Sequence, residues 1–95
     1  MISYYKHSNM EKEIIEHVAY IKSSKNRYKV LKSLNKGMKI PSEIASETDI
    51  RLNHISALLK DLKEHNFVLC LNEEDSKGRM YVLTDTGKTV LNILQ

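Results

Sequence analysis

The sequence predicts a mainly α-helical domain that carries one small β-hairpin. Three observations support this fold class. Apolar residues recur at helical spacing over most of the chain, two helical patterns flank a tight turn within residues 40–65, and two short strand-like runs follow them. With 95 residues, the chain has the length of one domain with one modest core. We therefore expect residues 1–95 to form a single domain.

The first third of the chain predicts two helices. An apolar stripe at helical spacing indicates an amphipathic helix over residues 10–22, formed by Met10, Ile14, Val18 and Ile21. Residues 1–9 are expected to be flexible or loosely packed. Ser23 and Ser24 interrupt the pattern and offer an N-cap, and the Asn35-Lys36-Gly37 segment is a typical helix end. The second helix is therefore predicted from Lys25 to Asn35.

Two further helices are predicted on either side of a short turn. Pro41 suits the first turn of a helix and Ser42 can cap exposed amides, so a short third helix is expected from Ser42 to Glu47. Residues 48–50 form the turn. A fourth helix then runs from residue 51 or 52 to His65, where Asn66 is a candidate for a left-handed C-terminal stop.

The last third predicts a hairpin and a final helix. Residues 68–72 and 80–84 are β-branched or apolar runs, and the loop between them contains Asp75 and Gly78, which suit a chain reversal. Thr84 or Asp85 then caps a helix over residues 85–95. This order of elements is that of a winged helix-turn-helix over residues 24–84, with one extra helix at each end.

The fourth predicted helix has one apolar face and one small polar face. At about 100° per residue, four apolar side chains share an arc as wide as a core-facing stripe: Ile55, Leu58, Leu59 and Leu62. A DNA major groove admits one helix, and asparagine pairs best with adenine, so Asn53 is the leading base-reading candidate. The predicted base-reading residues are Arg51, Asn53, Ser56, Ala57 and Lys60. The alternative is an ordinary solvated helix face.

The positive charge of the chain is unevenly distributed. The net charge is only +3, yet seven basic residues from Lys22 to Lys39 follow one another without an acidic residue between them. Such a segment favours contact with phosphates, although a solvated lysine-rich helix is the alternative. The predicted phosphate contacts are Lys25, Arg27, Lys29, Lys32 and Ser42.

The hairpin loop has mixed charge. Lys77 and Arg79 are predicted wing contacts, with Arg79 suited to a narrow A·T minor groove or else simply solvated. The preceding acidic residues, Glu73 to Asp75, disfavour approach to a DNA backbone. The wing is therefore expected to turn partly away from DNA.

Four blocks in order carry a resemblance to a known class of protein: residues 41–45, 50–56, 59–64 and 81–87. With them the chain resembles winged helix-turn-helix transcription regulators of the MarR-like and ArsR-like groups, particularly small prokaryotic and archaeal members. The resemblance covers about Ser24 to Leu94, and its most specific part is the Leu-Thr-x-x-Gly sequence that ends at Gly87.

The resemblance implies binding to double-stranded DNA and places residues 51–60 of the reading helix at the groove. Ala57 departs from the pattern, because the family often has arginine there. Such regulators usually act as homodimers, and the helices at residues 10–22 and 85–94 are the surfaces that this chain offers for pairing. The alternative is that both terminal helices simply pack on the domain's own core.

Several other functions are disfavoured by the sequence. Cys70 is the only cysteine, which precludes an intramolecular disulfide or a thiolate zinc cluster within one chain; it is expected to pack as a small apolar residue, with an oxidation switch as the alternative. Glu13 and His17 supply two possible metal ligands, which do not make a site, so we expect no metal and no cofactor. No catalytic motif is present, and we expect no enzyme.

Location and partner are the remaining expectations. Neither a signal peptide nor a membrane span is indicated, so a cytoplasmic protein is predicted. The main alternative to a DNA reader is a winged-helix adaptor that binds another protein through its wing or third helix, with the acidic loop at residues 73–75 as the contact.

Overall fold

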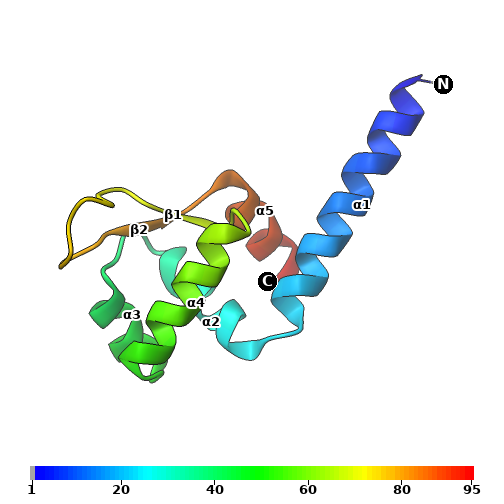
Figure 1. Cartoon of the computed structure of the whole chain (residues 1–95). Coiled ribbons are helices and arrows are strands. Elements are labelled where there is room, and N and C mark those ends of the chain that lie inside the picture. The colour runs from blue at the N-terminus through cyan, green and yellow to red at the C-terminus, as the bar shows by residue number, and fades with distance from the viewer. Residues whose placement is uncertain (1) are drawn as a thin grey trace.

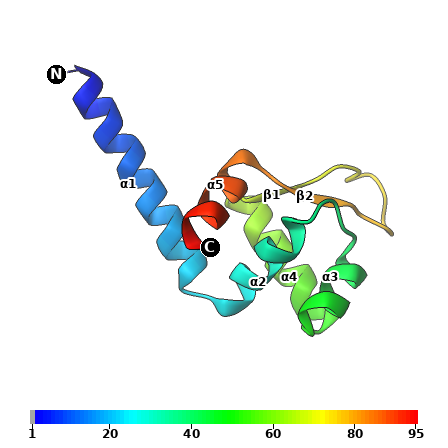
Figure 2. The ribbon, with the colours of Figure 1, turned by 180° about the vertical axis from the view of Figure 1, so that it is seen from behind.

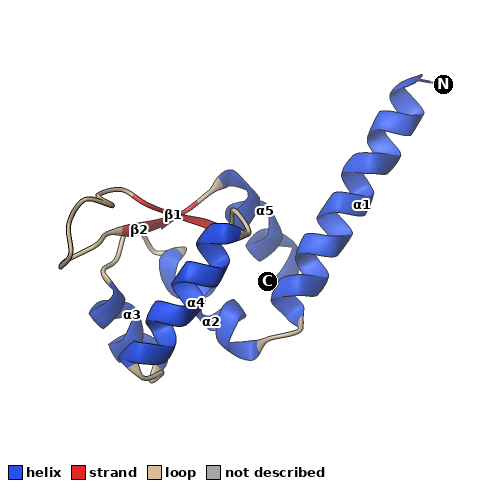
Figure 3. Cartoon of the chain, in the orientation of Figure 1, coloured by secondary structure: helices blue, strands red, loops and turns tan. Residues whose placement is uncertain are grey.

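The computed structural model describes residues 2–95, with side chains described from residue 11 onward. Five helices and one hairpin follow the predicted order (Figure 3). The elements are α1 (Ile2–Lys22), α2 (Lys25–Leu34), α3 (Pro41–Thr48), α4 (Leu52–Glu64), β1 (Val68–Cys70), β2 (Tyr81–Leu83) and α5 (Asp85–Leu94). The predicted fold class, mainly α with a small hairpin and a helix at each end, is confirmed.

Helix α1 is longer than predicted. It begins at Ile2 rather than at residue 10, because no proline or glycine interrupts the first 22 residues. Figures 1 and 2 show its N-terminal half running away from the rest of the molecule, while its C-terminal half packs beside α5. The side chains of residues 1–10, Met10 among them, lie outside the described residues, so the loose packing of residues 1–9 stays a prediction.

Side-chain caps fix the starts of α2 and α5 where the sequence predicts them. Ser24 Oγ accepts a hydrogen bond from the Arg27 amide at 3.2 Å, and Thr84 Oγ1 accepts one from the Gly87 amide at 3.0 Å. Asn66 has a φ of 64°, which confirms the left-handed stop after α4. Helix α4 itself ends at Glu64, one residue before the predicted end at His65.

The start of α3 corrects the predicted cap. Helix α3 begins at Pro41, so Ser42 lies inside its first turn and does not cap it. Instead, the Glu43 carboxylate accepts a hydrogen bond from the Ile40 amide at 3.0 Å. A capping carboxylate in the first turn also interacts favourably with the helix dipole.

The hairpin is shorter than predicted because a side chain replaces part of its ladder. Strands β1 and β2 pair antiparallel over three residues each, with Leu69 opposite Val82. Beyond Cys70, the Met80 carbonyl still accepts the Leu71 amide at 2.8 Å, but the Met80 amide donates to Asn72 Oδ1 at 2.7 Å instead of to the opposite backbone, which ends the regular ladder. On the other side of β2, the backbone of Lys39 exchanges two hydrogen bonds with Tyr81, at 3.1 and 2.9 Å.

The core lies between the helices and the inner face of the hairpin. All four residues of the predicted α4 stripe are buried: Ile55, Leu58, Leu59 and Leu62. They meet apolar side chains from the other elements, chiefly Ile21, Val30, Leu31, Ile44, Phe67, Leu83, Val90 and Leu91. Cys70 is half-buried against this core, as expected of a small apolar residue. Burial of one face of α4 leaves its other face in solvent.

Gly87 is required where the first turn of α5 lies against the backbone of Phe67, between α4 and β1. A Cβ at this position would lie 2.3 Å from the Phe67 carbonyl oxygen, which already accepts the Thr84 amide at 3.1 Å. We expect Gly87→Ala to lower the free energy of unfolding by about 1–3 kcal/mol, the usual cost of overpacking, although alanine is the better helix former. Denaturant unfolding measures the change. Lys88→Ala, an exposed neighbour on α5, is the control, and equal losses for the two variants would contradict the steric explanation.

Candidate nucleic-acid interface

The outer face of α4 carries the predicted base-reading residues. Arg51 and the residues Asn53, Ser56, Ala57 and Lys60 are all exposed. The last four follow helical spacing and therefore share one stripe, opposite the buried stripe. Ser56 Oγ donates to the Leu52 carbonyl at 3.1 Å, so this hydroxyl lies close to the helix surface. The stripe is thus flat and polar, with only Lys60 projecting far.

The N-terminus of α4 has no side-chain cap. Arg51 occupies the N-cap position but makes no capping hydrogen bond, and its side chain is exposed. The first-turn amides of a helix carry partial positive charge and attract anions. This end of α4 is therefore suited to a phosphate group.

The tip of the hairpin loop faces the start of α3 and the outer side of α4 across two hollows. One hollow of about 350 Å³ is lined by Ser56 and Lys60 from α4 and by Arg79 from the loop. A second, of about 290 Å³, is lined by Ser42, Ser56 and Lys77. Pro41, Ser56 and Gly78 line both hollows, so the two form one concave surface, which we call the wing–helix groove. Five predicted residues from three segments meet there: Ser42, Ser56, Lys60, Lys77 and Arg79.

The loop that forms one side of the wing–helix groove is held by its own hydrogen bonds. Arg79 Nε donates to the Asp75 carbonyl at 2.7 Å, and its Nη2 donates to the Glu73 carbonyl at 3.1 Å. Asn72 Nδ2 donates to an Asp75 carboxylate oxygen at 2.9 Å and to the Gly78 carbonyl at 3.2 Å. The loop is therefore ordered before any partner arrives.

The acidic character of the loop is partly neutralised. Lys63, near the end of α4, forms a hydrogen-bonded ion pair with Glu73. This hydrogen bond lowers the pKa of the Glu73 carboxyl and raises the pKa of the Lys63 ammonium group. One of the three acidic residues that disfavour DNA in the sequence thus has its charge compensated within the protein.

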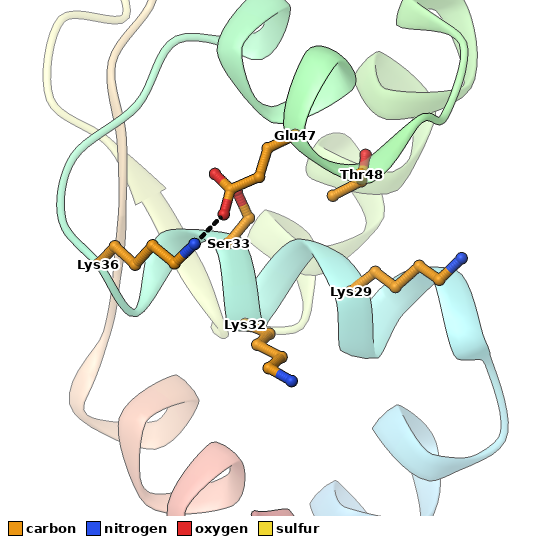
Figure 4. Close-up of a pocket in the computed structure, with 6 residues that line it drawn as sticks. All are labelled: Lys29, Lys32, Ser33, Lys36, Glu47 and Thr48. Atoms are coloured by element: carbon orange, nitrogen blue, oxygen red, sulfur yellow. Dashed lines mark hydrogen bonds and ion pairs between the residues drawn. The ribbon is translucent and has the colours of Figure 1, made fainter.

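The basic segment from Lys22 to Lys39 does not form one surface. Lys36 binds Glu47 at 2.6 Å (Figure 4). Lys39 lies 3.5 Å from the same carboxylate and donates to the Ser33 carbonyl. Hydrogen bonds from Lys36 and then Ser33 hold the pKa of Glu47 below its usual value. Two of the seven basic residues are therefore paired with α3.

Lys29 and Lys32 stand apart from the wing–helix groove. They line a separate hollow of about 230 Å³ between α2 and α3, and in Figure 4 their side chains extend away from Glu47. No residue that lines this hollow lines the groove. Lys25 is exposed at the start of α2. The structure thus does not bring these predicted phosphate contacts together with the α4 stripe.

The Arg27 side chain contacts other residues of the protein rather than extending into solvent. Its guanidinium lies 3.8 Å from the centre of the Tyr20 ring, and its Nε lies 3.4 Å from Asp61 Oδ2. Asp61 also accepts a hydrogen bond from the Tyr20 hydroxyl. Burial, aided by this bond, raises the pKa of Tyr20 to about 12 despite the nearby guanidinium. Sequence reasoning missed this cluster, because no local pattern links positions so far apart in the chain.

Two further observations concern other kinds of site. Among the side chains from residue 11 onward, no three or more His, Cys, Asp or Glu residues are grouped as a metal ion requires. In the described part of the chain, no helix combines the length and apolar character needed to cross a membrane.

Comparisons with known proteins establish the fold. No protein-family model matches the chain, and no curated protein matches it. Solved structures do, and at their low sequence identities they show that the chain has the winged helix-turn-helix fold.

Three of these structures illustrate the similarity. A MarR family transcription regulator is 14% identical, with a TM-score of 0.69; the match covers 90% of this chain and 58% of that one. A mutant of E. coli MarR complexed with operator DNA is 19% identical, with a TM-score of 0.68, over 97% of this chain and 67% of that one. A homodimeric winged helix-turn-helix DNA-binding domain from Mycobacterium bovis, a possible ArsR-family regulator, is 21% identical, with a TM-score of 0.66, over 90% and 76%.

Proposed function

We propose that the protein is a DNA-binding transcription regulator that places α4 in the major groove of duplex DNA. The observation that carries this proposal is the small polar stripe of α4 beside the cationic wing–helix groove. A major groove is about 12 Å wide and admits a helix whose outward side chains are short. Support comes from the E. coli regulator of the same fold, which was solved with operator DNA.

The geometry favours different roles for the predicted residues. Asn53 reads base edges, with Ser56 and Ala57 allowing close approach. Arg51 lies at the uncapped start of α4, and Lys60 lies at the far end of the same exposed stripe as Asn53. Each binds either a base edge or a phosphate. Ser42, Lys77 and Arg79 line the wing–helix groove of the protein and contact the DNA backbone there. The donors of Arg79 that are free of hydrogen bonds within the loop are directed to a minor groove of the DNA.

The basic residues of α2 take a smaller part. Lys25, Lys29 and Lys32 contact phosphates only where DNA continues past the wing–helix groove. Arg27 is not among the proposed phosphate contacts, because its guanidinium already contacts Tyr20 and Asp61. The electrostatic contribution to binding thus comes mainly from α4 and the wing.

We also propose that the protein is a cytoplasmic homodimer paired through α1 and α5. Ile15 on α1 and Ile93 on α5 are 67% and 52% exposed, although both are large apolar side chains. Twofold pairing through these helices would bury them and place the two α4 helices about one DNA turn apart, which favours a palindromic site. The Mycobacterium bovis domain of the same fold is homodimeric.

Titration of a labelled duplex at two salt concentrations tests the proposal. Binding is expected to weaken with salt by about 0.9 log units per log unit of salt for each phosphate contact. Lys60→Ala is expected to lower affinity, whereas Lys36→Ala, at an exposed lysine away from the groove and from the helices proposed to pair the dimer, serves as the control. Absence of binding to duplex DNA at low salt contradicts the proposal.

A protein-binding adaptor is the second candidate. The outer face of the hairpin exposes Leu69 and Leu71, at 41% and 55%, next to the acidic residues Glu74 and Asp75. This surface points to a partner protein rather than to a phosphate backbone. An adaptor predicts no salt-dependent binding to duplex DNA, so the same titration separates the two candidates.

A further inference from the structure

Four side chains connect the protruding helix α1 to the C-terminal end of α4. We call them the Tyr20 cluster: Tyr20, Arg27, Asp61 and His65. The Tyr20 hydroxyl donates to Asp61 Oδ2 across a sequence separation of 41 residues. The Tyr20 ring stacks on the His65 ring, with centroids 4.4 Å apart and planes 25° apart. A single side chain of α1 thus contacts the last turn of α4, at Asp61, and the residue that follows the helix, His65.

Arg27 closes the cluster from α2. Its Nη1 donates to the Tyr20 carbonyl at 2.9 Å and to Ser23 Oγ at 3.2 Å, and its Nε faces Asp61 Oδ2. One guanidinium therefore contacts the last turn of α1, the α1–α2 turn and α4. A planar group with several fixed donors is well suited to hold three segments at one angle.

Phe67 supports the cluster from the core side. Its ring stacks on Tyr20, with centroids 5.6 Å apart and planes 7° apart, and meets the His17 ring edge-on at 5.3 Å. His65 Nδ1 lies 2.8 Å from the Asp61 carbonyl and 3.2 Å from the Tyr20 hydroxyl, which fixes the His65 ring as well. Aromatic and polar contacts therefore act on the same residue of α1.

The position of this cluster in the fold gives it a mechanical consequence. Helix α1 runs past the body of the molecule, and its N-terminal half extends beyond the other elements (Figure 1). A small rotation at Tyr20 therefore becomes a large displacement at the far end of α1. Asp61 lies on the same helix as the α4 stripe, and His65 follows directly after its last residue, so the cluster links the orientation of α1 to that of α4.

We propose that the Tyr20 cluster is a joint that sets the angle between α1 and α4, with Tyr20 and Asp61 as its positioning residues. As far as DNA is concerned, this inference rests on the proposed function: in a dimer paired through α1 and α5, the joint determines the separation of the two α4 helices. Two α4 helices at a fixed separation select one half-site spacing. A loose joint loses that selection while each α4 still reads its own half-site.

The angle itself is measured without DNA and without assuming a dimer. Spin labels are placed at Lys12→Cys on α1 and His54→Cys on α4, both exposed positions, in a Cys70→Ala background and diluted with unlabelled protein, so that only distances within one chain are observed. The parent protein is expected to give one narrow distance distribution. Tyr20→Phe, which keeps the ring, and Asp61→Asn, which keeps the shape, are each expected to broaden it.

A tyrosine elsewhere provides the matched control. Tyr28→Phe removes the hydroxyl of a half-buried tyrosine on α2 and is expected to leave the distribution unchanged. Circular dichroism confirms that each variant is folded. Unchanged distributions in both folded Tyr20→Phe and Asp61→Asn overturn the joint, whether or not the protein binds DNA.

The DNA readout then tests the consequence. Tyr20→Phe is expected to reduce the preference for a palindromic duplex over the same duplex with altered half-site spacing by roughly 2- to 30-fold, the range of coupling through contact networks. Affinity for a single half-site is expected to stay constant. An equal loss of affinity for half-sites and for palindromes contradicts a positioning role. Failure of the unmodified protein to bind any duplex overturns the proposed function. In that case the distance measurement alone tests whether the Tyr20 cluster sets the angle.

Discussion

Replacing Phe67 by alanine is expected to lower the free energy of unfolding by about 3–5 kcal/mol, the cost of removing a buried aromatic side chain. The Phe67 side chain is fully buried, between α4 and β1, and its ring packs against Tyr20 and His17 of α1. Its amide also donates to the Leu62 carbonyl at 2.9 Å. A small domain has few other apolar contacts to compensate for such a cavity.

Chemical denaturation with circular dichroism measures this loss. Leu71→Ala is the matched control, because Leu71 lies on the same hairpin and is 55% exposed, so its truncation is expected to change stability by less than about 0.5 kcal/mol. A loss below about 1 kcal/mol for Phe67→Ala would contradict the central place of this ring in the core.

The elements of the fold were predictable where the signal is local. Ser24 and Thr84 are followed by a helix and bond to amides three residues later, and Asn66 adopts the left-handed conformation that ends α4. The buried stripe of α4 follows from helical periodicity alone. The predicted cap was wrong at α3, where two neighbouring side chains could each bond to a free amide of the first turn. Glu43 rather than Ser42 supplies this cap.

The candidate site was predictable only in part, because charge patterns do not reveal tertiary partners. The wing–helix groove joins Ser42, Lys60 and Lys77 from three segments, and each of these side chains was singled out by its type and its neighbours. The same reasoning grouped Arg27 with exposed lysines. Its partner, Asp61, lies on another helix and carries no local sign of that contact.

The distribution of charge in the structure also changes how the acidic residues are interpreted. Glu73 disfavours DNA when the sequence is read alone, yet it is paired with Lys63 of the same chain. Asp61, on α4 itself, is likewise paired with Arg27. Exposed ion pairs contribute little to stability. Their effect here is to reduce the negative potential next to the α4 stripe and the wing.

Asn53→Ala is expected to reduce discrimination between a preferred duplex and a scrambled one by about 1–3 kcal/mol, or roughly 5- to 150-fold, the value of one good base contact. Asn53 lies in the first turn of α4 on the exposed stripe, where a side chain inserted into the major groove meets base edges first. Its amide offers a donor and an acceptor together, which matches the major-groove edge of adenine. Because the side chain is exposed, the substitution is expected to leave the stability of the free protein nearly unchanged.

Two controls separate base reading from general attraction to DNA. Asn35→Ala makes the same change at an exposed position directly after α2, away from the groove and from the helices proposed to pair the dimer, and is expected to affect neither affinity nor discrimination. Lys77→Ala removes a wing cation and is expected to weaken preferred and scrambled duplexes alike, lowering the salt dependence by about one phosphate contact. The preferred duplex comes from selection of bound sites out of a random pool, and affinities are measured by fluorescence anisotropy. If Asn53→Ala weakens both duplexes equally, as Lys77→Ala is expected to do, then Asn53 contacts the backbone and base reading falls to Arg51 and Lys60, the remaining long side chains of this face.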